Sequence, residues 1–271
     1  MENPYPFHLC QPDDPKSCGA CCGLYNLQDH SRRTLTNLLR QKTELFHVAP
    51  KDGRLIEYRE AVAGLPLNPK LLETVYNCEF LGYIDPAQRR VGCLLHPSRH
   101  DGEDQRYHSF YGPELCSGHY CPSYTYLAPV EQAAVIATVH DWYLYGLVIT
   151  DIDLVKEFFQ EIQTRLGDHL RPERLASPGV TEALVDFFRL KEFWKFASPQ
   201  NRLGKYYFTY DEYRIARIEY EKNWQIKPSR FDKIFLSLSS EFKTPGEVLE
   251  AESIIEAKIK EFLRAYTAEP Q

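Results

Sequence analysis

The segment Cys18-Gly19-Ala20-Cys21-Cys22-Gly23 limits what this chain can fold into more than any other stretch of its sequence. Three cysteines fall within five positions, and glycines lie between and after them. A Cys-x2-Cys step lets two thiolates converge on one ion or cluster, and glycine lets the backbone turn tightly around what is bound. The segment therefore predicts a metal or iron–sulfur site.

The cysteines are confined to one part of the 271-residue chain, because none follows position 121. In a reducing compartment such clustering favours metal ligation over disulfides. Eight thiolates could fill two four-ligand sites, but the count alone leaves one centre or two open. All eight are candidate metal ligands: Cys10, Cys18, Cys21, Cys22, Cys78, Cys93, Cys116 and Cys121.

Composition excludes several classes of partner. With 43% hydrophobic residues, 26% charged residues and a net charge of −6, the chain has no general attraction to nucleic-acid phosphate or anionic lipid. Its first ten residues lack the pattern of a secretory signal. The most apolar run, residues 133–150, is interrupted by His140 and Asp141 and is too short for a membrane span. We expect a cytoplasmic protein with no membrane segment and no nucleic-acid partner; its protein partner or substrate is unknown.

Apolar spacing predicts a mainly α fold in two regions. Residues 1–128 are expected to form an irregular, metal-stabilised, cysteine-rich half packed on a helical half, residues 129–271, and the two halves could form one compact unit. Helical stripes begin at Leu154, Phe231 and Val248. Further helices are expected over residues 130–150, 180–196 and 211–222.

Regular structure is expected to be sparse in the cysteine-rich half. The pattern predicts a helix over residues 34–46, a short strand over 54–60 and a helix over 71–76. From Cys78 to Tyr126 apolar periodicity fades, and Gly, Pro, His and aromatic residues dominate. Loops of that length need a reason to be ordered, and a bound metal is one such reason.

The cysteine pattern resembles a known family of cysteine-rich, zinc- or iron-chelating proteins of the CxxCxxCC type, whose relatives include the iron–sulfur flagellin lysine N-methylases. Four elements carry the resemblance, which covers roughly residues 10 to 124: Cys18-Gly19-Ala20-Cys21-Cys22, Cys78-Glu79-Phe80-Leu81, Gly92-Cys93-Leu94-Leu95-His96-Pro97, and Cys116 with Cys121. Pro15 stands where the family's first cysteine falls, so Cys10 is the candidate for that role. The Arg-Pro element of the family is absent. The resemblance implies metal or cluster binding, with a redox or methyl-transfer-related role.

Adjacent Cys21 and Cys22 are poorly suited to share one tetrahedral zinc, because consecutive side chains tend to diverge. One could ligate while its neighbour packs or serves a second centre. A [4Fe–4S] cluster takes thiolates from separate directions, which suits the dispersed cysteines. Zinc accepts both Cys and His, and His96 and His119 become candidates in that alternative. Some cysteines could instead be buried small apolar residues.

Three other patterns are interpreted as structural. Glu44 and His47 have Glu-x-x-His spacing, but a di-iron bundle needs a second copy, so they are expected to be surface residues. His140 and Asp141 are expected to form a hydrogen-bonded core pair. The aromatic run 205–210 is expected to be a half-buried strand rather than a base-stacking surface.

Three hypotheses of function follow. The first is a redox or catalytic iron–sulfur protein, and the second is a structural zinc protein whose helical half binds a partner. The third is a thiol-based redox sensor, which requires exposed cysteines of low pKa. No residue can be assigned as a general base, so the sequence leaves open whether the protein is an enzyme.

Overall fold

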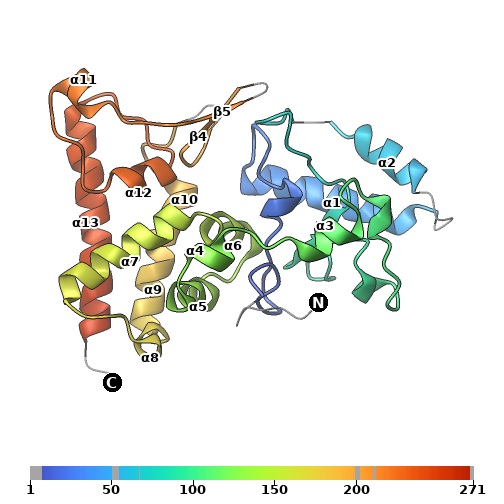
Figure 1. The fold of residues 1–271 in the computed structure, drawn as a ribbon, viewed down its shortest axis with the longest axis horizontal. Helices are drawn as coiled ribbons and strands as arrows, with labels where there is room; N and C mark the ends of the chain where they lie inside the picture. The colour runs from blue at the N-terminus through green and yellow to red at the C-terminus, as the bar shows by residue number, and fades with distance from the viewer. Residues whose placement is uncertain (1–7, 51–54, 67, 199–201, 210–211, 269–271) are drawn as a thin grey trace. The chain divides into compact units, whose positions relative to one another are not determined.

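The computed structural model of the chain describes residues 8–50, 55–66, 68–198, 202–209 and 212–268 (Figure 1). The chain is mainly helical, as the apolar spacing predicts, with two small antiparallel sheets among the described residues. It divides into two compact units. The cysteine unit comprises Met1–Cys121, Asp141–Gly146 and Thr209–Asp211; the helical unit comprises Pro122–His140, Leu147–Phe208 and Glu212–Gln271.

The regular elements of the cysteine unit are short apart from its first helix. They are the 3-10 helices η1 (Ala20–Cys22), η2 (Pro97–Arg99) and η3 (Arg106–His108), the helices α1 (Arg32–Val48), α2 (Ile56–Ala63) and α3 (Gly112–Gly118), and the strands β1 (Leu81–Tyr83) and β2 (Val91–Cys93). Helix α6 (Trp142–Ile149) begins in this unit and ends in the other.

The helical unit carries the remaining elements. They are α4 (Ser123–Tyr126), α5 (Pro129–Thr138), α7 (Ile152–Leu166), α8 (Pro172–Leu175), α9 (Pro178–Phe188), α10 (Leu190–Phe193), β3 (Arg202–Leu203), β4 (Tyr206–Phe208), β5 (Tyr213–Ile215), α11 (Tyr220–Trp224), α12 (Asp232–Ser237) and α13 (Pro245–Thr267).

Helix α1 and the hairpin β1–β2 form the framework of the cysteine unit. Ser31 caps α1 by accepting a hydrogen bond from the Thr34 amide, and α1 packs against β1. A side chain at Gly82 would collide with Thr43 Oγ1 at 2.7 Å, so glycine is required for the strand to approach the helix. Thr43 Oγ1 also accepts a hydrogen bond from the Tyr83 amide (2.8 Å). The hairpin therefore has a fixed position on α1.

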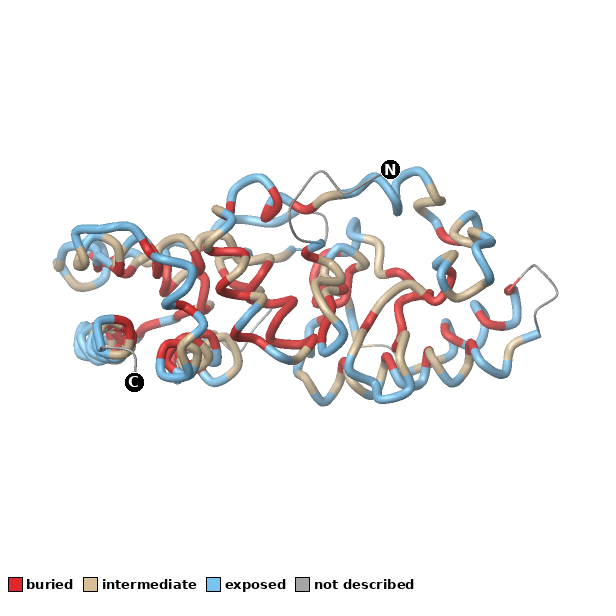
Figure 2. Tube along the Cα trace, turned by 90° about the horizontal axis from the view of Figure 1, so that it is seen from below, coloured by how far each residue is buried: buried red, intermediate tan, exposed pale blue. Residues whose placement is uncertain are grey.

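Helices α7, α9 and α13 hold the core of the helical unit, which Figure 2 marks by its buried residues. Asp151 caps α7 and Thr244 caps α13, which also has Pro245 at its first position. The stripes that the sequence predicts for α7 and α13 are buried. Their buried residues are Leu154, Val155, Phe158, Phe159 and Ile162 on α7, and Val248, Ala251, Ile255, Ile259, Phe262 and Tyr266 on α13.

Two predictions for the cysteine unit are wrong. Residues from Ile56 form helix α2 instead of a strand, because Tyr58 and Val62 bury one helical face; residues 51–54 lie outside the described part of the chain. Residues 71–76 form turns instead of a helix, because the Asn26 side chain accepts from the Leu72 amide (2.9 Å) and donates to the Leu72 carbonyl (3.0 Å). The Leu72 carbonyl is shared between Asn26 and the Val75 amide, which closes a turn instead of an α-helical bond.

The helices expected over residues 130–150 and 211–222 are also interrupted. The run 130–150 breaks between α5 and α6, where His140 is exposed and Asp141 pairs with Arg32 at 2.7 Å, so the expected core pair of His140 and Asp141 is wrong. In the run expected as a helix over 211–222, residues 213–215 form β5, which pairs with β4 in the register Tyr206↔Ile215. Position 211 lies outside the described residues, and a short helix, α11, follows.

None of the helices within the described residues combines the length and the hydropathy needed to cross a membrane.

Candidate metal centre

The cysteine motif forms a tight turn that holds a second chain segment against it. Gly23 follows the last residue of η1 and caps it. Its φ of 77° favours glycine, and its amide donates to the Ala20 carbonyl (2.9 Å). A side chain at Gly23 would lie 2.5 Å from the Tyr76 carbonyl oxygen. The Cys78 amide donates to the Cys22 carbonyl (2.9 Å). Gly23 therefore allows the segment that carries Cys78 to lie directly beside Cys22.

A first set of four cysteines lies around Cys18. The Cys18 amide donates to the Cys10 carbonyl (2.9 Å). Burial raises the pKa of the Cys18 thiol, and the charges of Cys10 and Cys121 raise it further. A hydrogen bond with the Cys121 side chain raises the pKa of Cys21, and burial and Cys18 add to that rise. These four residues, Cys10, Cys18, Cys21 and Cys121, are called the first cysteine group.

A second set of four lies around Cys22. Burial raises the pKa of Cys22 well above its ordinary value, and Cys78, Cys93 and Cys116 raise it further, in that order, with Cys18 of the first group adding the smallest contribution. Burial raises the pKa of Cys78 to about 12 and that of Cys93 to about 11. The charge of Cys93 contributes to the first shift, and that of Cys116 to the second. Cys22, Cys78, Cys93 and Cys116 are called the second cysteine group.

The hairpin positions two members of the second group. Cys93 ends β2 and pairs with Leu81 of β1, three residues after Cys78. The Leu94 amide donates to the Phe80 carbonyl (2.8 Å) just beyond that pair. Cys78 belongs to a buried apolar cluster, and Cys22 and Cys93 pack against its edge. The thiols of Cys22, Cys78 and Cys93 therefore lie in apolar surroundings, whereas Cys116 is exposed.

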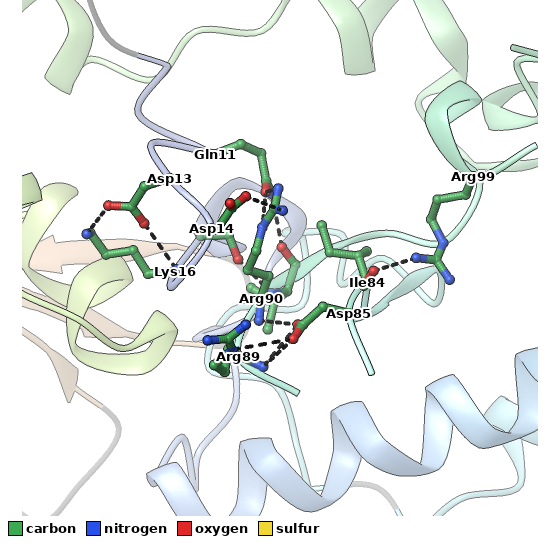
Figure 3. Close-up of polar contacts among 11 residues, drawn as sticks. Gln11, Asp13, Asp14, Lys16, Ile84, Asp85, Arg89, Arg90 and Arg99 are labelled. Atoms are coloured by element: carbon green, nitrogen blue, oxygen red, sulfur yellow. Dashed lines mark hydrogen bonds and ion pairs between the residues drawn. The ribbon is translucent and has the colours of Figure 1, made fainter. Parts of the chain in front are cut away.

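Hydrogen bonds attach the lead-in segment that carries Cys10 to the same hairpin. Gln11 Nε2 donates to the Val91 carbonyl (3.1 Å), and Gln11 Oε1 accepts from Arg90 Nη2 (2.7 Å; Figure 3). The Val91 amide donates to Ser17 Oγ (2.6 Å). Both ends of the segment between Cys10 and Cys18 are thereby held. Cys10 joins the first group despite its unusual spacing.

Charged side chains are distributed unequally around the two groups. Lys42 is buried, and its Nζ donates to the Cys78 carbonyl (2.9 Å). Burial lowers the pKa of Lys42, while Cys78, Glu79 and Cys22 act to raise it. Arg106 lies near Cys93 and Cys116, but its side chain is paired with Asp104 through three hydrogen bonds of 2.8, 3.1 and 2.6 Å. The second group therefore has a buried cation beside it.

The two candidate histidines have other roles. His96 Nδ1 is 2.8 Å from Ser98 Oγ and accepts from the Ser98 amide (3.2 Å), and so the ring caps η2. His119 is exposed at the end of α3. Glu44 and His47 are exposed on α1. The arrangement thus brings cysteines together and leaves these histidines at caps and surfaces.

Each group offers four thiols, and thiolates are ligands both of zinc and of iron–sulfur clusters. Zinc–sulfur bonds of ~2.3 Å would bring four sulfurs within roughly 4 Å of one another. Within the described part of the chain, no set of three or more Cys, His, Asp or Glu side chains is arranged to hold a single metal ion.

Raised pKa values also describe how reactive the thiols are without a ligand. Because burial keeps Cys18, Cys22, Cys78 and Cys93 protonated at neutral pH, they are poor nucleophiles. A bound metal displaces such protons. None of the eight cysteines is joined in a disulfide.

Lys42 is the residue of this site that sequence reasoning missed. Its signal was its position, because Leu35, Leu39 and Phe46 at helical spacing form the buried face on which Lys42 lies. A lysine within such a stripe indicates either that its ammonium group has a partner in the interior or that it has a functional role. Arg106 had no comparable signal, since it lies in a loop without periodicity.

Comparisons with protein-family models, with curated proteins and with solved structures found no match for this chain.

Proposed function

We propose that the chain is an iron–sulfur protein that holds two four-iron clusters, one in each cysteine group. The division of the eight cysteines into two groups of four carries the proposal. Four thiolates are the ligand set of a [4Fe–4S] cluster. The neighbours Cys21 and Cys22 then serve different centres, in agreement with the divergence of consecutive side chains.

A redox role follows from the distance between the centres. Because Cys21 and Cys22 are consecutive, their Cα atoms are about 3.8 Å apart, and the two groups are adjacent. Each cluster, when bound, supplies a one-electron carrier. The protein residues supply thiolates, exclude water through the apolar cluster around Cys78, and keep the carriers close together. We therefore propose electron transfer as the role; the family resemblance also suggests a methyl-transfer-related substrate.

The proposal includes a reducing, cytoplasmic location, since cysteines near one another that are not joined in disulfides would oxidise elsewhere. A thiol sensor is disfavoured by the raised pKa of Cys18 and Cys22, because a sensor needs thiolates at neutral pH.

Anaerobic purification followed by metal analysis tests the proposal. The expected product is brown and contains about eight iron and eight sulfide per chain, the content of two four-iron clusters. Cys10→Ser and Cys116→Ser should each remove one cluster and leave about half the iron. Colourless protein without iron after anaerobic reconstitution would overturn the proposal, as would zinc filling both groups. Loss of all iron from either variant would contradict two separate centres.

A further inference from the structure

The sheet of the helical unit ends in an exposed strand. Among the described residues β5 pairs with β4 alone, so its other side is an edge of the sheet (Figure 1). All three residues of β5 are exposed, and Tyr213 and Ile215 are 56% and 58% exposed despite their large apolar side chains. An uncovered edge of this kind is a template on which another strand can pair.

The register identifies the backbone groups that this edge offers. The Ala216 amide donates to the Lys205 carbonyl (2.6 Å), and the alternation of an antiparallel ladder makes Arg214 the next residue of β5 bonded to β4. Tyr213 and Ile215 lie at the intervening positions, so their amides and carbonyls point away from β4. In the part of the chain that the structure describes, these outward groups have no hydrogen-bond partner.

The side chains at the edge alternate in character. Ile215 lies directly opposite Tyr206, and the Tyr206 ring contacts the Tyr213 ring edge to face, with centroids 5.3 Å apart, so these three residues share one face of the sheet. Arg214 projects from the other face. Its side chain is 75% exposed and pairs with Glu212 at 2.8 Å, a type of surface pair that contributes little. The edge therefore presents an apolar, a cationic and an apolar residue in turn.

Charge decides which kind of strand fits this edge. Because the outward groups belong to Tyr213 and Ile215, a second copy of β5 that overlaps the whole strand in antiparallel fashion would place two Arg214 side chains directly opposite each other. Like charges directly opposite destabilise a strand pair, whereas opposite charges stabilise it. A strand with an acidic residue at that position and apolar residues on either side complements the edge. A different chain is therefore favoured over a second copy.

We propose that β5 is the docking edge for an extended segment of a partner protein with apolar–acidic–apolar alternation, which adds to the sheet as a fourth, antiparallel strand. Main-chain bonds give such strand addition its affinity, and alternate side chains give it specificity. The two apolar residues of the segment exchange backbone hydrogen bonds with Tyr213 and Ile215, and its acidic side chain pairs with Arg214. The assignment holds whether or not the cysteine unit binds clusters.

Fluorescence anisotropy with the full-length protein and a labelled peptide, Ser-Thr-Val-Glu-Val-Thr-Ser, tests the backbone part of the proposal. Saturable binding is expected. Methylating the backbone nitrogens of both Val residues should weaken it more than about tenfold, because those amides face β5. Methylating the nitrogen of Glu, which faces solvent, is the matched control and should change the affinity less than about twofold. Absence of saturable binding, or equal loss from either methylation, would overturn the proposal.

Exchange of charges tests the pairing with Arg214. A peptide with Lys in place of Glu should bind the native protein about fivefold more weakly. Arg214→Glu, a change at an exposed side chain, should reverse this preference. Lys222→Glu makes the same change of charge at an exposed position of α11 and should leave the preference as in the native protein. An Arg214→Glu variant that still prefers the Glu peptide would show that the strand does not bind at this edge.

Ile215→Pro tests the edge itself, because it removes an outward amide without removing a bond to β4. It should abolish peptide binding, while Ile215→Val, which keeps the amide, should bind within about twofold of the native protein. Hydrogen exchange should show protection of residues 213–215 when the peptide binds the native chain. A native protein that is dimeric in light scattering and becomes monomeric on Ile215→Pro would show that a second copy occupies the edge, which would contradict the proposal.

Discussion

The helical unit and the cysteine unit differ in what fills their interiors. In the helical unit Phe158 stacks on Phe187, with ring centroids 4.0 Å apart, and contacts Phe262 edge to face. In the cysteine unit the interior includes an ammonium group, Lys42, and buried thiols such as Cys78. Apolar burial stabilises the first kind of interior without help. The second kind contains groups whose stability depends on what they bind.

Removing the clusters that we propose should give the largest effect and the sharpest test of this comparison. Chelation under reducing conditions is expected to abolish amide-exchange protection over residues 18–30 and 71–95, because the thiols lose the group that holds them together. Residues 152–166 and 245–267 should keep their protection. Hydrogen-exchange mass spectrometry measures both regions in one sample. Equal protection with and without metal would mean that the cysteine unit folds on apolar burial alone.

Phe158→Ala should destabilise the helical unit and leave the cysteine unit unchanged. Phe158 is fully buried, and its loss should destabilise the helical unit by about 3–5 kcal/mol through lost transfer energy and a cavity. Iron content should remain that of the native protein. Phe193→Ala is the control, since Phe193 is 71% exposed and should cost under about 0.5 kcal/mol. Denaturant unfolding, monitored by the circular dichroism signal of helix, measures the stability of both variants. Loss of iron from Phe158→Ala would show that the units are not independent in stability.

Asn26→Ala should weaken the cysteine unit by a smaller amount. The Asn26 side chain bonds both the amide and the carbonyl of Leu72, and its loss leaves the buried Leu72 amide unpaired at a cost of about 2 kcal/mol, while the carbonyl keeps its bond from the Val75 amide. The segment that positions Cys78 should loosen and the second group should lose iron first. Asn68→Ala removes two similar bonds to the exposed backbone of Asp29 and serves as the control. Equal iron retention by both variants would argue against this role of Asn26.

Glu256→Gln should produce the smallest effect, confined to the helical unit and dependent on pH. Two hydrogen bonds from Arg165, each 2.9 Å, lower the pKa of Glu256 to about 2. A folded-state pKa below the unfolded value of 4.5 means that the ion pair stabilises the unit above pH 4.5. That contribution is lost as the pH falls from 4.5 towards 2. The variant should be less stable by about 1 kcal/mol at pH 7.

Urea unfolding of the native protein and of the Glu256→Gln variant between about pH 7 and pH 2.5 measures this difference in stability. The difference should shrink steadily as the pH falls below 4.5, the unfolded value. A difference that stays constant across this range would show that the substitution acts through packing and not through charge.

The helical unit is the more predictable from sequence. The spacing of Phe158, Ile162, Ile255 and Ile259 identifies α7 and α13, because a long amphipathic helix repeats the same signal over several turns. The run 130–150 does not form the single helix that its apolar residues predict, because Asp141, which interrupts it, pairs with Arg32 from a distant part of the chain. The residues close to Asp141 in the sequence do not indicate that its partner is Arg32.

The sequence by itself identified which residues are the candidate ligands, since eight cysteines confined to 121 residues are already a chemical signal. Only the tertiary structure indicated how they group, since Cys10 and Cys121 act on Cys18 and Cys21, and Cys78, Cys93 and Cys116 act most strongly on Cys22. It also placed Lys42 beside the second group. The physical reason is that grouping depends on long-range contacts, such as the bonds from Cys78 to Cys22 and from Gln11 to Val91, which no spacing along the chain encodes.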